Sequence, residues 1–207
     1  MTYTMTAPKI LGKSHLDDGA ALLARVFQND PMMKYLAVDT TDMIKKTTPF
    51  YRANIRLGFT DGEVYTLPSL EGIAVWLKPG NTDFTFGQFL RSGLLTATFS
   101  MGLKSFGRLM RSASFFDDVK KKAISGPHWV LVFLGVDPIH QNKGLGGHLI
   151  QPILAKADAE GLSCYLDSTN KRNLTFYQRH GFKIAANVKV PKGGPEIWAM
   201  VRQPGSY

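Results

Sequence analysis

The chain contains 207 residues, which is enough for one domain with a substantial core and too few for two comfortable ones. Hydrophobic residues make up 44% of the sequence and charged residues 20%, the ordinary balance of a soluble globular protein. The central apolar run, Trp129–Leu134, is far shorter than a membrane span, so we expect no membrane segment.

The single cysteine, Cys164, limits the chemistry that the chain can carry. It cannot form an internal disulfide, and it excludes a zinc site built from cysteines. Because Cys164 lies in the apolar run Leu162–Leu166, we expect a buried structural thiol. The histidines and acidic residues form no evident metal-ligand cluster, so we predict no metal. Met1–Lys9 lacks the features of a secretory signal, which together with the lone cysteine predicts a cytoplasmic location.

The net charge of +9 favours a polyanionic partner, either a nucleic acid or a polyanionic cofactor. The basic residues are spread along the chain, and no basic run interleaves aromatic residues as nucleic-acid motifs do. A solvated basic surface explains the same charge. The composition therefore disfavours nucleic acid as a partner without selecting a function.

The sequence pattern of the first eighty residues predicts two helices and a hairpin. A helix is expected over residues 14–28, whose first residue is a serine that can act as N-cap. A second helix is expected over Asp42–Leu57, which Pro49 divides or kinks. Glu63–Leu67 and Glu71–Leu77 are typical of two strands joined by a tight connection.

Residues 81–126 form a helical insert in what we expect to be a single domain spanning residues 1–207. The insert is rich in Phe, Leu, Met and Gly, and it contains no convincing strand. Two or three short helices there would bury eight apolar side chains, namely Phe89, Leu90, Leu94, Leu95, Phe99, Leu103, Phe106 and Met110. The insert then either packs over the core or also forms the wall of a substrate pocket.

The last eighty residues alternate strands and helices. The valine-rich run Trp129–Val136 predicts a strand covered on both faces. The remaining elements are a helix over Gly144–Gly161, a strand over Leu162–Leu166, a short helix over Asn173–His180 and a strand pair over Phe182–Val190 and Ile197–Val201. This order indicates helices around a mixed sheet.

The turn at residues 141–148, Gln-Asn-Lys-Gly-Leu-Gly-Gly-His, has the properties of an anion site. Its glycines let the backbone approach a ligand, and the first N–H groups and the dipole of the following helix favour a phosphate. Lys143 adds charge at the rim. The segment lacks the Lys-Ser/Thr of a P-loop, and Leu149 stands where a Rossmann turn needs glycine. A glycine-rich turn that only allows tight packing is the other interpretation.

Two motifs resemble those of the GNAT family of N-acetyltransferases. They are Gln-x-x-Gly-x-Gly after an apolar strand, and Tyr165–Thr169 followed by Asn173–Phe182, in family order and at family spacing. The similarity is strong over residues 128–204 and extends to antibiotic-modifying members that act on puromycin. It implies an α/β (α+β) fold with a central, mixed, mostly antiparallel sheet, splayed at the acyl-CoA site and flanked by helices.

The resemblance implies acetyl-CoA as the co-substrate. The backbone of Leu134, Gly135 and Val136 would hydrogen-bond the pantetheine arm, with help from the side chain of Asn173. The pyrophosphate site would comprise Gln141, Asn142, Lys143, Gly144, Leu145, Gly146, Gly147 and His148. Tyr177 would protonate the departing thiolate of CoA, a role for which a phenol is chemically suited.

The acceptor amine must lose a proton before it attacks the thioester. Asp167 is the first candidate for the base, directly or through water, and Asp30 and His128 are alternatives. An amine can attack acetyl-CoA directly in a ternary complex, so no nucleophilic triad is required.

The expected function is therefore acetyl transfer from acetyl-CoA to a primary amine of a small molecule, such as an antibiotic-like amine. The acceptor can instead be a protein N-terminus or a lysine, and a catalytically silent acyl-CoA-binding sensor is a further alternative. A homodimer is compatible with the sequence.

Overall fold

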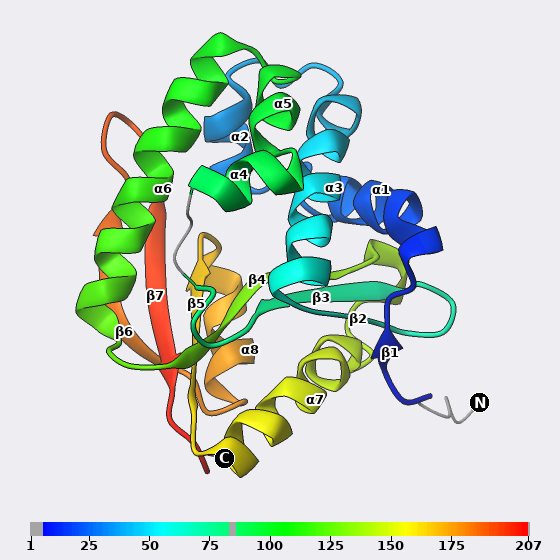
Figure 1. Cartoon of the computed structure of the whole chain (residues 1–207), viewed down its shortest axis with the longest axis vertical. Helices are drawn as coiled ribbons and strands as arrows, with labels where there is room; N and C mark the ends of the chain where they lie inside the picture. The colour runs from blue at the N-terminus through cyan, green and yellow to red at the C-terminus, as the bar shows by residue number, and fades with distance from the viewer. Residues whose placement is uncertain (1–5, 83–85, 207) are drawn as a thin grey trace.

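The computed structural model describes residues 6–82 and 86–206 of the chain. Its centre is a seven-stranded sheet in the order β1-β2-β3-β4-β5-β7-β6, in which β4 and β5 are parallel and the other described pairs antiparallel. The strands are β1 (Lys9–Ile10), β2 (Gly62–Thr66), β3 (Gly72–Leu77), β4 (His128–Val136), β5 (Ser163–Ser168), β6 (Lys183–Lys189) and β7 (Glu196–Arg202). The expected mixed, mostly antiparallel sheet is thus confirmed (Figure 1).

Helices cover both faces of this sheet, with α3 and α7 on opposite sides of β3 and β4 (Figure 1). The helices are α1 (Leu16–Val26), α2 (Pro31–Ala37), α3 (Met43–Asp61), α4 (Phe86–Ser92), α5 (Leu94–Phe99), α6 (Leu103–Ala123), α7 (Leu145–Glu160) and α8 (Leu174–Gln178). Three short 3₁₀ turns are η1 (Lys13–His15), η2 (Pro138–His140) and η3 (Lys171–Asn173). None of the helices within the described ranges is long and apolar enough to cross a membrane.

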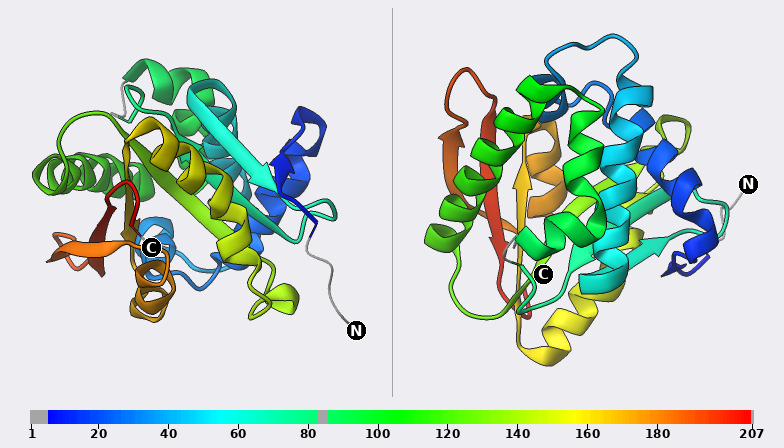
Figure 2. Two further views of the ribbon diagram at one scale, coloured as in Figure 1. Left: turned by 90° about the horizontal axis from the view of Figure 1, so that it is seen from below. Right: turned by 45° about the horizontal axis from the view of Figure 1, so that its top comes forward.

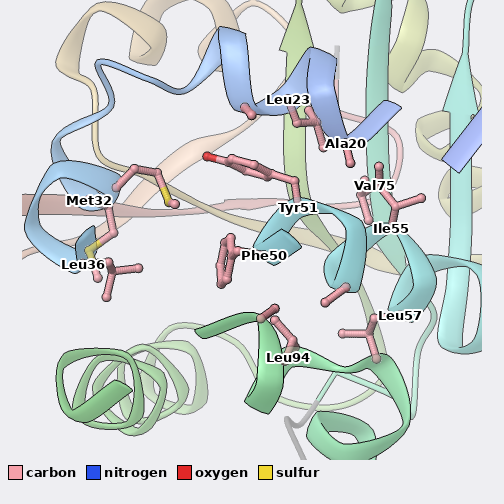
Figure 3. Close-up of a cluster of buried hydrophobic side chains, with 14 of the residues drawn as sticks. Ala20, Leu23, Met32, Leu36, Phe50, Tyr51, Ile55, Leu57, Val75 and Leu94 are labelled. Carbon is pink, nitrogen blue, oxygen red and sulfur yellow. The ribbon is translucent and has the colours of Figure 1, made fainter. Parts of the chain in front are cut away.

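The sheet separates two hydrophobic cores because successive strand residues point to opposite faces. Val75 and Leu77 of β3 join a core with α1, α2, α3, α5 and α6, whereas Ala74 and Trp76 join a core with α7 and α8. Figure 3 shows the first core, where Tyr51 extends from α3 toward α1 and α2. Any site that joins the two cores must pass through the sheet.

Most of the expected elements are present, with different ends. The first helix begins at Leu16 after η1, so the serine at position 14 lies in a 3₁₀ turn and makes no capping hydrogen bond. Helix α3 continues through Pro49, and α7 continues through Pro152. Neither proline divides its helix.

The insert differs most from the prediction, because α6 is a helix of 21 residues rather than a short one. It packs against α5 and β7, and α5 packs against α3 (Figure 2). Leu94 is buried, but the expected burial of four other side chains is wrong, with exposed fractions of 56% for Leu90, 51% for Phe99, 77% for Leu103 and 39% for Met110. The side chain of Phe89 lies outside the described residues. The face of α6 that carries Leu109, Ala113 and Phe116 lines a cavity, and Leu103 and Met110 are exposed among charged residues outside that face.

Candidate active site

Strands β4 and β5 diverge in the middle of the sheet. They pair only between His128–Leu131 and Ser163–Leu166, while β4 continues along β3 as far as Val136 and β5 continues along β7 as far as Ser168. From Val132 onward, β4 therefore no longer pairs with β5. Such an open edge can accept an extended ligand as an added strand. The splayed sheet expected from the sequence is present.

A β-bulge lies at the point where the strands diverge. Val75 of β3 pairs with Phe133 and Trp76 with Leu131, so Val132 is an extra residue in β4. Both Val132 and Phe133 consequently pack on the α3 side of the sheet, whereas Leu131 and Leu134 pack on the α7 side. Bulges of this kind re-aim side chains and are frequent next to active sites.

The bulge places the ring of Phe133 in an aromatic cluster with α1 and α3. Its centroid lies 5.5 Å from that of Phe27, 6.2 Å from that of Phe50 and 5.2 Å from that of Tyr51, all edge to face. Edge-to-face packing at these distances is favourable. The cluster gives the site a rigid apolar floor.

The turn after β4 carries two residues with left-handed backbone, Asn142 with a φ of 62° and Gly144 with a φ of 78°. The side chain of Gln141 donates a hydrogen bond of 3.0 Å to the carbonyl oxygen of Val136, which ties the turn to the end of the strand. Helix α7 then starts at Leu145 without a side-chain cap. Its first N–H groups have no partners within the helix, so the turn can bind an anion.

Two of the predicted glycines have a packing role. A β-carbon at Gly147 would lie 2.5 Å from Nε2 of His180, and one at Gly146 would lie 3.3 Å from Cζ of Phe176. These glycines therefore allow α7 to approach α8. Nε2 of His148 lies 3.0 Å from the carbonyl oxygen of Thr6, so this ring contacts the N-terminal segment. Lys143 is exposed at the rim, and Leu145 is buried in the second core.

Tyr177 lies on α8 in the second core, where it is 8% exposed. Its ring packs edge to face on Phe176 at 5.1 Å and on Phe182 at 5.9 Å. Burial, and then the negative charge of Asp30, raise the pKa of Tyr177 well above its usual range. The phenol therefore keeps its proton at neutral pH. The side chain of Asn173, at the start of α8, is exposed and makes no cap to that helix.

Asp167 extends from the end of β5, next to the opening between the strands. Burial raises the pKa of Asp167 to about 7, although the hydroxyl of Tyr165 donates a 2.7 Å hydrogen bond to its Oδ1 and Lys120 is nearby. A carboxyl group that titrates near neutrality can accept a proton during catalysis. The sequence contained the signal for the Tyr165 partner, because residues two apart on a strand share a face.

The two alternative bases have different positions. The carboxylate of Asp30 accepts hydrogen bonds from the N–H groups of Met32 and Met33, at 2.9 and 3.1 Å, and from the hydroxyl of Thr169 at 2.7 Å. It thus caps α2 and joins it to the end of β5. Nδ1 of His128 lies 2.7 Å from the carbonyl oxygen of Gly126, at the paired end of β4 away from the divergence. Asp30 therefore lies near the end of β5, whereas His128 lies at the opposite end of β4 from the divergence.

A cavity of about 240 Å³ lies on the α3 side of the diverging strands. It is lined by residues 130–133 of β4 on one edge of the gap and by Asp167 on the other, so it reaches the opening itself. Met32 and Leu36 of α2, Phe50 of α3 and Leu94 of α5 also line it, and Figure 3 shows them around a common space. The insert contributes one face of α6. No group of three potential metal ligands occurs among the described side chains.

The comparisons with known proteins agree with this geometry. Residues 64–182 match the family model described as the acetyltransferase (GNAT) family. An uncharacterised N-acetyltransferase of Schizosaccharomyces pombe is 27% identical over 97% of this chain and 84% of its own length.

Two solved structures share the fold. A histone acetyltransferase and related acetyltransferase from Corynebacterium glutamicum superposes with a TM-score of 0.69 at 18% identity, over 97% of both chains. A Drosophila melanogaster polyamine N-acetyltransferase superposes with a TM-score of 0.62 at 15% identity, over 95% of this chain and 99% of that one. Because the family model covers more than half of the sequence, the chain belongs to the GNAT family and is an acetyl-CoA-dependent acetyltransferase.

Proposed function

We propose that this protein transfers the acetyl group of acetyl-CoA to a primary amine of a small molecule, by direct attack in a ternary complex. The observation that carries the proposal is the position of Asp167. This carboxyl group, with a pKa of about 7, lines a largely apolar cavity at the gap between β4 and β5. Such a position supports a role as the base, because it lies between the proposed cofactor side and the proposed acceptor side of the sheet.

The described residues fit acetyl-CoA, which supplies an activated acetyl thioester. The unpaired edge of β4 at Leu134, Gly135 and Val136 suits a pantetheine arm, which carries amide groups. The left-handed turn and the first N–H groups of α7 suit a pyrophosphate. Asn173, at the end of η3 directly before α8, is exposed, so its side chain is available to the pantetheine arm. Asn142 and Gly144 therefore act through backbone conformation, and Gln141 acts by holding the turn.

Two side chains carry the proton chemistry that we propose. Asp167 accepts the proton of the acceptor ammonium, directly or through one water, because its pKa lies at neutrality. Tyr177 donates a hydrogen bond toward the sulfur that leaves as a thiolate. Its raised pKa favours hydrogen-bond stabilisation over complete proton transfer.

The only cysteine supports direct attack over an acyl-enzyme. Cys164 is fully buried, as the sequence predicts, and burial raises the pKa of its thiol to about 12. The thiolate that would have to form a thioester with the enzyme is therefore scarce at neutral pH.

The cavity favours a small acceptor. Pockets for drug-sized ligands usually measure about 300–1,000 Å³, and the present cavity measures about 240 Å³. Of its three carboxyl groups, Asp117 is paired with Lys120, whereas Asp30 and Asp167 favour an ammonium ion, and the aromatic and aliphatic walls favour an apolar body. The polyamine N-acetyltransferase of Drosophila, which shares the fold, also acts on an amine by its description.

The test measures release of free CoA from acetyl-CoA with a panel of primary amines, including puromycin, polyamines and one-ring amines. A second panel contains peptides with free N-termini or lysines. We expect turnover with one-ring or short-chain amines and none with peptides, and Asp167→Asn abolishes it. Turnover confined to peptides would assign a protein acceptor. Tight binding of acetyl-CoA by calorimetry without turnover on either panel would contradict the proposal.

A further inference from the structure

One face of the insert helix α6 forms a wall of the acceptor cavity. The residues on this face recur at intervals of one, three and four positions, as expected for a single helical stripe. They are Leu109, Ser112, Ala113, Phe116, Asp117 and Lys120. This stripe therefore contacts whatever fills the cavity.

The polar side chains that line the cavity differ in whether they have hydrogen-bond partners. The ammonium of Lys120 donates to the carbonyl oxygen of Thr82 and lies 3.2 Å from Oδ1 of Asp117. The side-chain amide of Asn54, on α3, donates a 2.9 Å hydrogen bond to the carbonyl oxygen of Phe50. Ser112 is 2% exposed, and its hydroxyl has no hydrogen-bond partner among the residues that the structure describes.

An unsatisfied buried hydroxyl in a cavity wall requires an explanation, since buried polar groups are almost always paired. Most serines on a helix satisfy their hydroxyl through a backbone carbonyl one turn earlier. Ser105 on the same helix does so, with a 2.8 Å hydrogen bond to the carbonyl oxygen of Met101. Ser112 makes no such bond, although it lies on the same helix and is equally buried.

We propose that Ser112 is a specificity-determining residue that hydrogen-bonds a neutral hydroxyl group on the acceptor, at the end remote from the amine. The inference rests on the proposed function and names its substrate class, an amine whose apolar body ends in a hydroxyl. A carboxylate is disfavoured at this end because Lys120, the cation of the described cavity wall, lies about two helical turns from Ser112 and is engaged by Asp117 and by a carbonyl oxygen.

The spacing along α6 separates Ser112 from the base. Lys120 and Asp167 line the same cavity and the charge of Lys120 acts on Asp167, so this part of α6 lies near the base. Ser112 precedes Lys120 by eight residues, which corresponds to about 12 Å along the helix axis. An acceptor whose amine lies at Asp167 therefore meets Ser112 only with a group at its far end, across one ring or a short methylene chain.

The experiment compares amines that differ by one hydroxyl. The aromatic pair is 2-(4-hydroxyphenyl)ethylamine and 2-phenylethylamine, and the aliphatic pair is 6-amino-1-hexanol and hexylamine. Wild-type protein should show a kcat/KM about tenfold higher for the hydroxylated member of at least one pair. Ser112→Ala should abolish this preference by lowering kcat/KM for the hydroxylated amine alone, and Ser112→Thr, which keeps a hydroxyl, should retain it.

Ser105→Ala is the matched control, because it removes a buried serine hydroxyl of α6 that does not line the cavity. Its preference should equal that of the wild type. Thermal unfolding of Ser112→Ala should occur at the wild-type temperature or above, because the hydroxyl removed has no partner. An equal preference in Ser112→Ala and wild type, or no preference in either pair, would overturn the inference while acetylation itself continues. Absence of acetylation with every amine would instead overturn the proposed function and the inference with it.

Discussion

Replacing Asp167 by asparagine should slow acetyl transfer and at the same time stabilise the fold. The carboxyl group has a pKa of about 7 because it is buried at the end of β5. Its ionised fraction therefore rises from about one in ten at pH 6 to about nine in ten at pH 8. If Asp167 is the base, the kcat/KM of the wild type should rise about tenfold over this range, and Asp167→Asn should lose about 10²–10⁴-fold of it at pH 8.

Asp167→Asn should increase the stability of the fold although it decreases the activity. A carboxyl group with a raised pKa is destabilising when ionised, because the unfolded chain releases its proton more readily. Below about pH 4 both states are protonated and asparagine should make no difference. Between about pH 4 and pH 7 the wild type loses stability, and a shift from 3.8 to about 7 corresponds to on the order of 2–4 kcal/mol. We expect a loss of stability at the lower end of this range, because Asp167 lines a cavity and its charge is less desolvated there than in the solid core.

Rates of CoA release and urea unfolding at pH 4, 6 and 8 test both effects. Tyr165→Phe is the companion variant, since it removes the 2.7 Å hydrogen bond that lowers the pKa of Asp167. It should move the inflection of the rate profile to higher pH while leaving the base in place. Retention of the wild-type kcat/KM and inflection by Asp167→Asn would refute the assignment of this carboxylate as the base.

Three further substitutions have distinct expected outcomes. Tyr177→Phe should lower kcat by about 10²–10³-fold and leave acetyl-CoA affinity nearly intact in calorimetry, and a fully active variant would remove the residue from the mechanism. Gly144→Ala should raise the KM for acetyl-CoA, because a φ of 78° is strained for alanine by about 1–2 kcal/mol and the turn would change its backbone conformation. Gly161→Ala, at the other end of α7 with a φ of 65°, is the control and should lower the stability by a similar amount without raising this KM. Arg202→Met should lower the free energy of unfolding by about 1.5–3 kcal/mol, because it removes two hydrogen bonds of 2.7 and 2.8 Å to the carboxylate of Asp158, whose side chain is 21% exposed. Urea unfolding measures the loss, and a change of under 1 kcal/mol would contradict a stabilising role of this ion pair.

The sequence predicted the central strands and helix α7 well because their signals are local. A few neighbouring residues are enough to identify each of three features. These are the apolar run of β4, the glycines at both ends of α7, and the hairpin of β2 and β3. The same holds for the turn at residues 141–148, whose glycine pattern requires particular backbone angles. The central sheet and the conformation of this turn could therefore be predicted from the sequence, whereas the cofactor contacts of the turn stay a prediction.

The acceptor side was less accessible because it depends on how elements are rotated relative to one another. The helical period shows which residues of α6 share a face, but apolar residues such as Leu103 and Met110 are exposed while polar residues such as Lys120 are buried, so residue type alone did not identify the inner face. Ser112 therefore had no signal of its own. The extra residue of β4, Val132, was also hidden, because a continuous apolar run has the same composition with or without a bulge.

The bulge at Val132 makes the length of β4 a determinant of chemistry as much as its composition. A deletion of that one residue would join Leu131 directly to Phe133 and restore regular pairing with β3, so that Phe133 to Val136 would keep their partners and their faces. It would also remove the Val132 side chain from the cavity wall, together with the local bend that a bulge gives to β4 where this strand leaves β5. A change in the length of β4 at this point would thus alter both the cavity wall near Phe133 and the unpaired strand edge proposed for the pantetheine arm. Substitutions in α6 can alter the cavity wall alone. Evolution of new acceptors is consequently expected to proceed through the insert and to leave the length of β4 fixed.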